Sequence, residues 1–242
     1  MKRNWLEVNK VVPILECIDM GQIAYEPMVR LQEQRHADVV ADKVDDALFL
    51  LEHPDVITLG KNSSAEHVLT SKDDLEESGC ELFQSTRGGD VTYHGPGQLV
   101  AYPIMRLREQ EKDIRKFVFN LEEILIRTCA DFNIHAQRVD GLRGIWVGHN
   151  KIAALGVRIA RWTTMHGVAL NVNTDLTKFS SIVPCGIAHR GVTSMEKILG
   201  RAPSMAEVKD VFVQHAGVIL NRELVLSQDL QSCALHFEAV QV

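Results

Sequence analysis

A cysteine in a bend and a lysine beside an apolar strand are the residues of this sequence best suited to covalent chemistry. Cys185 lies between Pro184 and Gly186, where a side chain can be presented rather than packed. A thiol attacks as its thiolate, so this cysteine needs a neighbouring base or positive charge. Lys151 is one candidate, because it opens the apolar run 152–157 and can lie in a partly dry site. A solvated lysine after a turn fits the same pattern.

Histidines are the other candidates for the group that activates Cys185, and the sequence offers His94, His149, His166 and His189. His189 follows Cys185 by four residues, but one such pair is a weak signal for a metal, and we expect no metal site. Cys129 falls on the apolar stripe of an expected helix, which predicts a buried core thiol.

The segment 87–98 is the second chemical feature, with four glycines and one proline in twelve residues. Glycine permits positive φ and lets a ligand approach the bare backbone. The segment also carries arginine, threonine, tyrosine, histidine and glutamine, which a plain turn does not need, and an apolar run follows at once. We interpret it as a binding loop on a rigid scaffold rather than an ordinary glycine-rich connection.

Composition narrows the class of protein. The chain has 242 residues, 45% of them hydrophobic and 24% charged, as in an ordinary globular protein. A net charge of −6 argues against general nucleic-acid binding. No apolar run is long enough to predict a membrane span. The five cysteines are odd in number and widely spaced, which favours a reducing compartment, so we expect a cytoplasmic protein.

Hydrophobic periodicity predicts the elements that must position these groups. We expect an edge strand at 11–18, a hairpin-like pair of strands at 47–51 and 56–60, and further strands at 81–86, 144–147, 151–160 and 163–172. Helices are expected at 21–42, 71–78, 113–132, 194–199 and 204–220. The pattern predicts an α/β fold, a single mixed-sheet domain with flanking helices over residues 1–242.

At this point four segments together resemble a known family. Segment 87–98 resembles the R-G-G-x-x-T-Y-H-G-P-G-Q signature of the lipoyl(octanoyl) transferases. Segments 148–157, 166–171 and 184–187 are similar to later motifs of that family, in the same order. The resemblance runs from about residue 52 to residue 187, and the combination is highly specific. The visible departures are Asp55, Ile57 and Asp90.

The resemblance implies a fold similar to the catalytic domain of biotin and lipoate protein ligases. It implies transfer of an octanoyl or lipoyl group from acyl carrier protein to a lysine of a lipoyl-accepting domain. Cys185 would form a thioester, and Lys151 would lower the pKa of its thiol and carry protons. The expected partners are octanoyl-acyl carrier protein, the lipoyl domains of 2-oxoacid dehydrogenases and the glycine cleavage H protein, with no nucleic acid and no membrane. We expect a monomer. We also expect no cofactor, since the chain lacks phosphate-binding motifs such as GxxxxGK[ST].

The resemblance also implies which residues line the acyl pocket: Arg87, Gly88, Gly89, Asp90, Val91, Thr92, Tyr93, His94, Ala154, Leu155, Gly156, Gly167, Val168 and Ala169. Small residues in the last two groups are expected to leave room for the chain. Because the implied partners are acidic, docking is expected to use basic residues, or these residues form only a solvated face. The candidates are Arg106, Arg108, Lys112, Arg115, Lys116, Arg158 and Arg161.

Two other functions fit parts of the sequence. An ATP-dependent lipoate or biotin ligase of the same broad fold would need no nucleophilic cysteine. A non-catalytic acyl-chain binding protein would keep the pocket and tolerate loss of Cys185.

Overall fold

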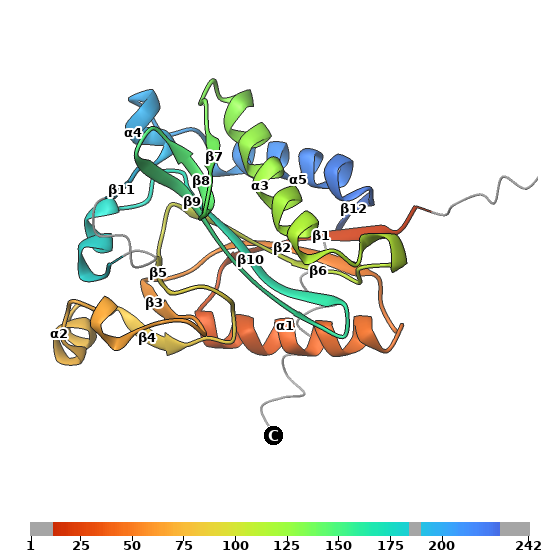
Figure 1. Cartoon of the computed structure of the whole chain (residues 1–242), viewed down its shortest axis with the longest axis horizontal. Helices are drawn as coiled ribbons and strands as arrows, with labels where there is room; N and C mark the ends of the chain where they lie inside the picture. Colours follow the sequence, from red (N-terminus) through yellow and green to blue (C-terminus); the bar gives the residue numbers. More distant parts are fainter. Residues whose placement is uncertain (1–11, 184–189, 228–242) are drawn as a thin grey trace, which may run out of the picture.

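A computed structural model describes residues 12–183 and 190–227, and these form a mixed α/β structure built on one large sheet (Figure 1). Its strands run in the order β12-β1-β2-β6-β10-β9-β8-β7, and β11 pairs with β9. Their bounds are β1 (Ile14–Gln22), β2 (Asp46–Glu52), β6 (Gln98–Ile104), β7 (Gln137–Val139), β8 (Leu142–Val147), β9 (Asn150–Ala160), β10 (Thr163–Asn171), β11 (Gly191–Val192) and β12 (Glu223–Ser227).

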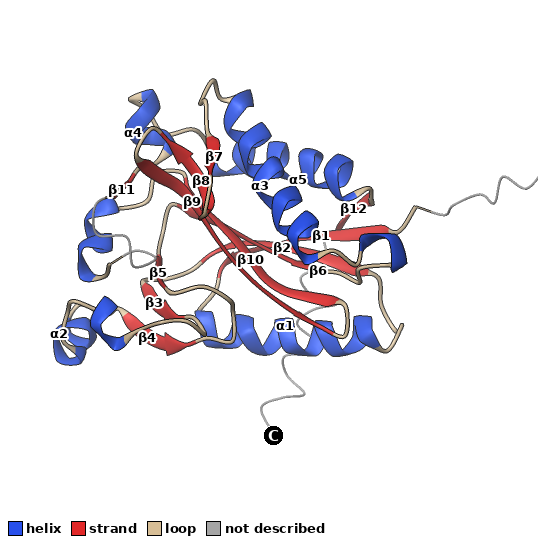
Figure 2. Ribbon diagram, in the orientation of Figure 1, coloured by secondary structure: helices blue, strands red, loops and turns tan. Residues whose placement is uncertain are grey.

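Helices cover both faces of this sheet (Figure 2). Helix α1 (Tyr25–Val40) packs on one face, while α3 (Ile114–Asp131) and α5 (Met205–Leu220) pack on the other. Each layer has its own apolar core, because residues at three- and four-residue steps of the helices meet alternate residues of the strands. The shorter helices α2 (Lys72–Glu77) and α4 (Met195–Leu199) lie outside these layers.

A second sheet of three strands holds the glycine-rich loop. Its order is β4-β3-β5, with β3 (Val56–Leu59), β4 (Glu81–Gln84) and β5 (Val91–His94). It encloses a smaller apolar cluster that includes Ile57, Tyr93 and Phe179. The loop between β4 and β5 therefore starts and ends on a fixed support.

The structure confirms the mixed α/β fold and corrects two details of it. Strand β1 is not an edge strand, because β12 and β2 pair with it on either side in parallel. Strands β2 and β3 do not form a hairpin: β2 pairs with β1 and β6 in the large sheet, whereas β3 belongs to the small one. The short connection between β2 and β3 is compatible with a hairpin. Which strands pair in a sheet, however, depends on contacts between residues that are distant in sequence.

Side chains cap the starts of α2, α3 and α5. The Asp113 carboxylate accepts a hydrogen bond from the Lys116 amide at the start of α3, and Ser71 caps α2 in the same way. The Glu207 carboxylate accepts from the Ser204 amide at the start of α5. The Cys129 side chain is fully buried, as expected of a core thiol.

The hairpin of β9 and β10 joins the two sheets at the glycine-rich loop. Strand β8 pairs with β9 only as far as Ala153. Beyond that point the edge of β9 is bound by the loop, where the Gly88 amide donates to the Val157 carbonyl over 3.0 Å. Among the described residues, no helix has the length and apolar character needed to cross a membrane.

Candidate active site

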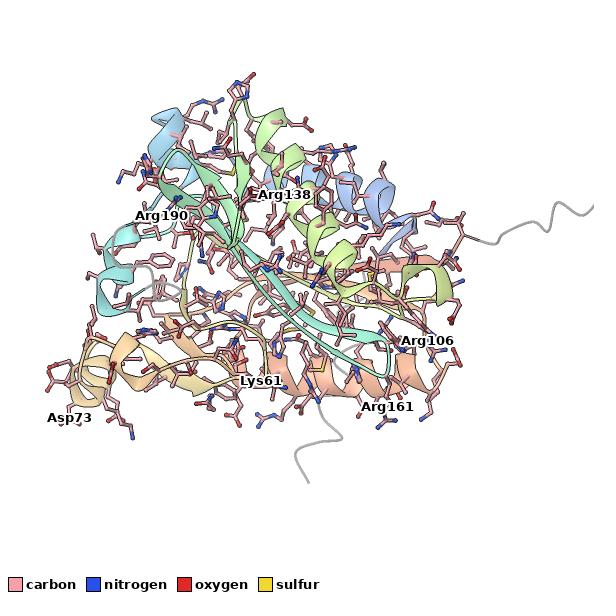
Figure 3. All side chains as sticks on the ribbon, in the orientation of Figure 1. Lys61, Asp73, Arg106, Arg138, Arg161 and Arg190 are labelled. Carbon is pink, nitrogen blue, oxygen red and sulfur yellow. The ribbon has the colours of Figure 1, made fainter. Side chains whose placement is uncertain are left out.

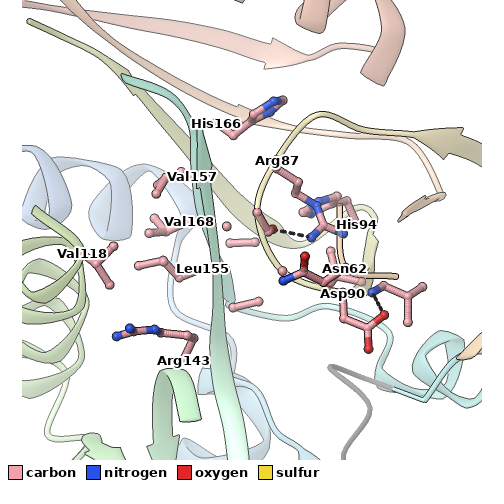
Figure 4. Close-up of a pocket in the computed structure, with 18 of the residues that line it drawn as sticks. Asn62, Arg87, Asp90, His94, Val118, Arg143, Leu155, Val157, His166 and Val168 are labelled. Atoms are coloured by element: carbon pink, nitrogen blue, oxygen red, sulfur yellow. Dashed lines mark hydrogen bonds between the residues drawn. The ribbon is translucent and has the colours of Figure 1, made fainter. Parts of the chain in front are cut away.

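A cavity of about 490 Å³ lies where the glycine-rich loop meets β9 and β10 (Figure 4). Arg87, Asn62 and His94 bound it on one side of the strands, and Val118, Leu155 and Val168 bound it on the other. All the residues that the sequence placed in the acyl pocket line this cavity, with one exception.

That exception is Tyr93, which is not among the cavity-lining residues. Its hydroxyl donates to Asp55 Oδ1 over 2.8 Å, and its ring packs against Phe179 in the core of the small sheet. Alternate residues of a strand face opposite sides, so Tyr93 points away from the side that Thr92 and His94 present to the cavity. The departure Asp55 also has a structural role here, since it forms an ion pair with Lys178 over 2.9 Å.

Arg87 ties the glycine-rich loop to the small sheet. Its Nε and Nη2 donate to the Thr58 hydroxyl over 3.1 and 2.9 Å, and Nη2 also donates to the Thr58 carbonyl. The guanidinium is buried, so these bonds are shielded from water and hold the loop in one position. Asp90 is held in turn, because its carboxylate pairs with His67 Nδ1 over 2.6 Å.

Two glycines of the cavity wall, Gly156 and Gly167, also allow close contact between backbones. A Cβ atom on Gly156 would lie 2.8 Å from the Gly88 carbonyl oxygen. A Cβ atom on Gly167 would lie 2.1 Å from the Ala101 carbonyl oxygen in β6. The two glycines face each other across the β9–β10 ladder, so the loop and the sheet approach at one narrow point.

One part of the cavity wall is apolar and was only partly predicted. Val118 from α3 and Leu142 from β8 join Leu155, Val157 and Val168 there. The sequence predicted the helix of Val118 but gave no signal that this residue reaches the cavity, because the approach of α3 to β9 is a tertiary contact.

The other part of the wall is polar and buried. Tyr25, Tyr102, His94 and His166 line it, and the sequence analysis missed both tyrosines. Burial lowers the pKa of His94 to about 3 and that of His166 to about 3, with smaller contributions from the Arg87 charge. Both imidazoles are therefore neutral at physiological pH.

Lys151 is buried in the wall of the same cavity, with only 6% of its surface exposed. This excludes the solvated lysine that the sequence had left open. Its Nζ lies 4.9 Å from the ring centroid of Trp146, the residue opposite it on β8. The Arg190 guanidinium carbon lies 5.0 Å from the centroid of that ring, so two cations flank one indole.

Of the side chains that could activate Cys185, some line the cavity and others do not. His94 and His166 line the cavity together with Lys151, whereas His149 is exposed at the turn before β9. Cys185, Gly186 and His189 lie outside the described residues. Within the described ranges, no group of three or more His, Cys, Asp or Glu side chains could hold a metal ion.

Two residues of the expected basic docking cluster, Arg106 and Lys112, form contacts within the protein itself. The Arg106 guanidinium binds Asp42 and the Val39 and Val40 carbonyls at the end of α1. Lys112 pairs with Glu109 over 2.6 Å and lies over the Trp162 ring. Arg106 and Arg161 also lie at the end of the molecule away from Arg190 (Figure 3).

Comparison with known proteins decides the family. The sequence model of the lipoyl protein ligase A/B catalytic domain matches residues 24–217. The chain belongs to this family. It is 48% identical over 206 residues to the octanoyltransferase of Solibacter usitatus, covering 85% of this chain and 93% of the relative. It is 44% identical over 207 residues to the octanoyltransferase of Caldicellulosiruptor bescii, covering 85% and 91%.

Solved structures confirm the fold expected of the family. The putative lipoate protein ligase of T. acidophilum with bound lipoic acid superimposes with a TM-score of 0.72 over 94% of each chain, at 14% sequence identity. At that identity the likeness concerns the fold alone.

Proposed function

We propose that this protein is an octanoyltransferase, which moves an octanoyl group from a carrier thioester to a lysine of a lipoyl-accepting domain. The observation that carries the proposal is the position of Lys151, buried in the wall of a cavity whose lining carries the family's glycine-rich loop. Relatives that bear the name octanoyltransferase match most of the chain. A non-catalytic acyl-chain binding protein would need the cavity but not a buried amine in its wall.

The proposed chemistry starts from a thiolate on Cys185, with the Lys151 ammonium as its proton donor. The thiolate attacks the thioester carbonyl, so a new carbon–sulfur bond forms and the bond to the carrier thiol breaks. The departing thiolate takes a proton from Lys151 Nζ, which becomes neutral. This step exchanges one thioester for another and is nearly neutral in free energy, so it needs no ATP.

In the second step the acceptor lysine arrives as a neutral amine and attacks the acyl group on Cys185. A carbon–nitrogen bond forms, the carbon–sulfur bond to Cys185 breaks, and the amine proton passes to neutral Lys151. The starting pair of thiolate and ammonium is restored. We propose backbone amides of the Lys151–Gly156 segment and of Gly186 as donors to the oxyanion.

The apolar side of the cavity supports a medium acyl chain as the cargo. The apolar side is formed by Val118, Leu142, Leu155, Val157 and Val168. Each methylene removed from water contributes about 0.8 kcal/mol, so several of them supply much of the binding free energy. We therefore place the octanoyl chain against these residues.

The expected partners follow from the proposed reaction: an octanoyl-acyl carrier protein as donor, and lipoyl domains and the glycine cleavage H protein as acceptors. Arg143 is exposed and lines the cavity, and Arg190 lies beside Trp146 next to Lys151. These two arginines are better placed to meet an acidic carrier than Arg106 and Arg161. We propose that the protein acts as a monomer formed by one catalytic domain.

The direct test is an assay of octanoyl transfer from octanoyl-acyl carrier protein to a purified lipoyl domain in the absence of ATP. The proposal predicts an added octanoyl group on the lipoyl domain by mass spectrometry. Transfer that occurs only from free octanoate with ATP would assign the protein to the ligases instead. Binding of the donor without transfer under either condition would assign it to acyl-chain binding.

A further inference from the structure

Three buried polar side chains form a hydrogen-bonded row from the cavity to the strand beside Lys151. His94 Nδ1 lies 2.7 Å from Gln98 Oε1, and Gln98 Nε2 donates to Asn171 Oδ1 over 2.9 Å. Asn171 Nδ2 donates to the Thr193 carbonyl over 3.0 Å. The exposed fraction is 1% for Gln98 and 4% for Asn171, so water does not compete for these bonds.

The Thr193 carbonyl determines which atom of each side chain in the row donates and which accepts. A carbonyl can only accept, so Asn171 must turn its amide nitrogen to Thr193 and its oxygen to Gln98. Gln98 then turns its nitrogen to Asn171 and its oxygen to His94, and His94 Nδ1 must carry the proton. The remaining nitrogen, His94 Nε2, is an acceptor on a side chain that lines the cavity. The titratable and charged groups around this imidazole are His53, Arg87, His166 and Tyr25, whose ring stacks on it with the centroids 6.0 Å apart.

The other end of the row reaches the backbone of Lys151. Asn171 ends β10, where that strand leaves β9, and β11 takes its place beside the start of β9. Val192 pairs with Lys151, and the Thr193 amide donates to the Lys151 carbonyl over 2.9 Å. Asn171 therefore bonds to the residue that secures Lys151 on its β11 side.

Gln98 and Asn171 are also brought together by the sheet itself. They are directly opposite each other in the antiparallel pairing of β6 with β10. The same two residues close the segments 87–98 and 166–171. Neither side chain lines the cavity, so direct contact with a substrate does not explain them.

We propose that Gln98 and Asn171 are positioning residues of the acyl-transfer site. They hold the His94 imidazole with Nε2 as an acceptor toward the cavity, and they fix β11 against Lys151. This inference rests on the proposed octanoyl transfer, because it assigns the row to the geometry of that reaction rather than to stability alone.

Gln98→Glu tests the row because a protonated glutamic acid can still donate once, to Asn171, and accept from His94, whereas the ionised form has no donor. The ratio of kcat in the variant to kcat in the unchanged protein should fall as pH rises and the new carboxyl ionises. At alkaline pH the expected loss is on the order of 10- to 100-fold, as for a small displacement of reacting groups. Gln137→Glu on the exposed strand β7 is the matched control and should leave kcat unchanged at every pH.

Asn171→Asp repeats the test at the next position in the row, with the same expected direction of pH dependence. Thermal unfolding of each variant is measured at each pH, so that loss of folded protein is separated from loss of kcat. A ratio that stays constant across pH in folded Gln98→Glu and Asn171→Asp would overturn the proposal. Absence of transfer by the unchanged protein would instead refute the proposed function.

A measurement on the unchanged protein does not depend on the folding of any variant. Long-range proton–nitrogen NMR correlations report which imidazole nitrogen of His94 carries the proton. The row requires a neutral ring protonated on Nδ1, with Nε2 bare. A neutral ring protonated on Nε2 would reverse the row and overturn the inference.

Discussion

The Nζ of Lys151 lies 4.9 Å from the ring centroid of Trp146, and both residues are buried where β8 pairs with β9. An indole face attracts a cation and replaces part of the hydration that burial removes. Trp146 thus allows an amine to remain in the cavity wall without free access to water. Arg190 approaches the same ring, which adds a second positive charge close to the cavity.

Trp146→Leu should therefore reduce activity more than Trp146→Phe. The phenyl ring keeps an aromatic face for the amine, whereas leucine provides none. Because cation–π contacts contribute about 0.5–2 kcal/mol, we expect kcat of the leucine variant to be about 2- to 30-fold below that of the phenylalanine variant. Steady-state kinetics at a temperature where both variants are folded measure this difference. Equal kcat values would show that the indole serves only to fill the core.

Lys151→Ala should slow formation of the acyl-enzyme most strongly near neutral pH. Without the ammonium, the Cys185 thiol reverts toward the pKa of a free cysteine, about 8.5, so less thiolate is present. The acylation rate of the variant should rise with pH and recover part of the loss above that value. Rapid-mixing acylation measured across pH provides the test. A loss of the same factor at every pH would indicate that Lys151 only supports the fold.

Val118→Phe should shift the preferred donor toward shorter acyl chains. Val118 reaches the apolar wall of the cavity from α3, and the added ring volume must enter the space proposed for the chain. The ratio of kcat/KM for octanoyl to that for hexanoyl donors should fall, by about fourfold for each methylene that loses its place. Val218→Phe is the control, since Val218 is exposed on α5. An unchanged ratio in Val118→Phe would place the acyl chain elsewhere.

Acidification should destabilise the protein before its carboxylates titrate. Burial lowers the pKa of His53 to about 4 and the pKa values of His94 and His166 to about 3. An unfolded histidine has a pKa of about 6.5, so between these values the unfolded chain binds more protons than the folded one. The contribution of these neutral histidines to the free energy of unfolding is fully present above about pH 6.5. It is lost as pH falls, by up to about 1.4 kcal/mol per pH unit for each histidine.

Urea unfolding at about pH 5, 6 and 7 measures that slope. His53→Gln should reduce the slope, because it removes one of the buried imidazoles, while His149→Asn at the exposed turn should not change it. A free energy of unfolding that does not vary over this range would contradict the assignment of neutral, buried histidines.

The sequence predicted the residues around the cavity better than the pairing of the strands. Residues 87–94, 154–156 and 167–169 come from recognisable motifs, and all but Tyr93 line the cavity. Tyr93 was misplaced because a motif read as a string does not show which residues of a strand share a face. The hairpin expected of β2 and β3 failed because local turn chemistry permits two strands to pair without deciding that they do.

Other parts of the site have no local signal. Tyr25 lies on α1 and Val118 on α3, and each reaches the cavity only because α1 packs against β10 and α3 packs against β9 and β10. The roles of Gly156 and Gly167 depend on the distance between backbones that are far apart in sequence. The same is true of Gln98 and Asn171, whose pairing appears only once β6 and β10 are placed side by side.

Covalent transfer through Cys185 can be tested by intact-protein mass spectrometry after mixing with octanoyl-acyl carrier protein. We expect one octanoyl adduct on the unchanged protein and on Cys129→Ser, whose thiol is buried in the core. Cys185→Ser should carry no octanoyl thioester, and the adduct should disappear when a lipoyl domain is added. An adduct that persists in Cys185→Ser, or transfer that continues at the full rate without Cys185, would contradict the account.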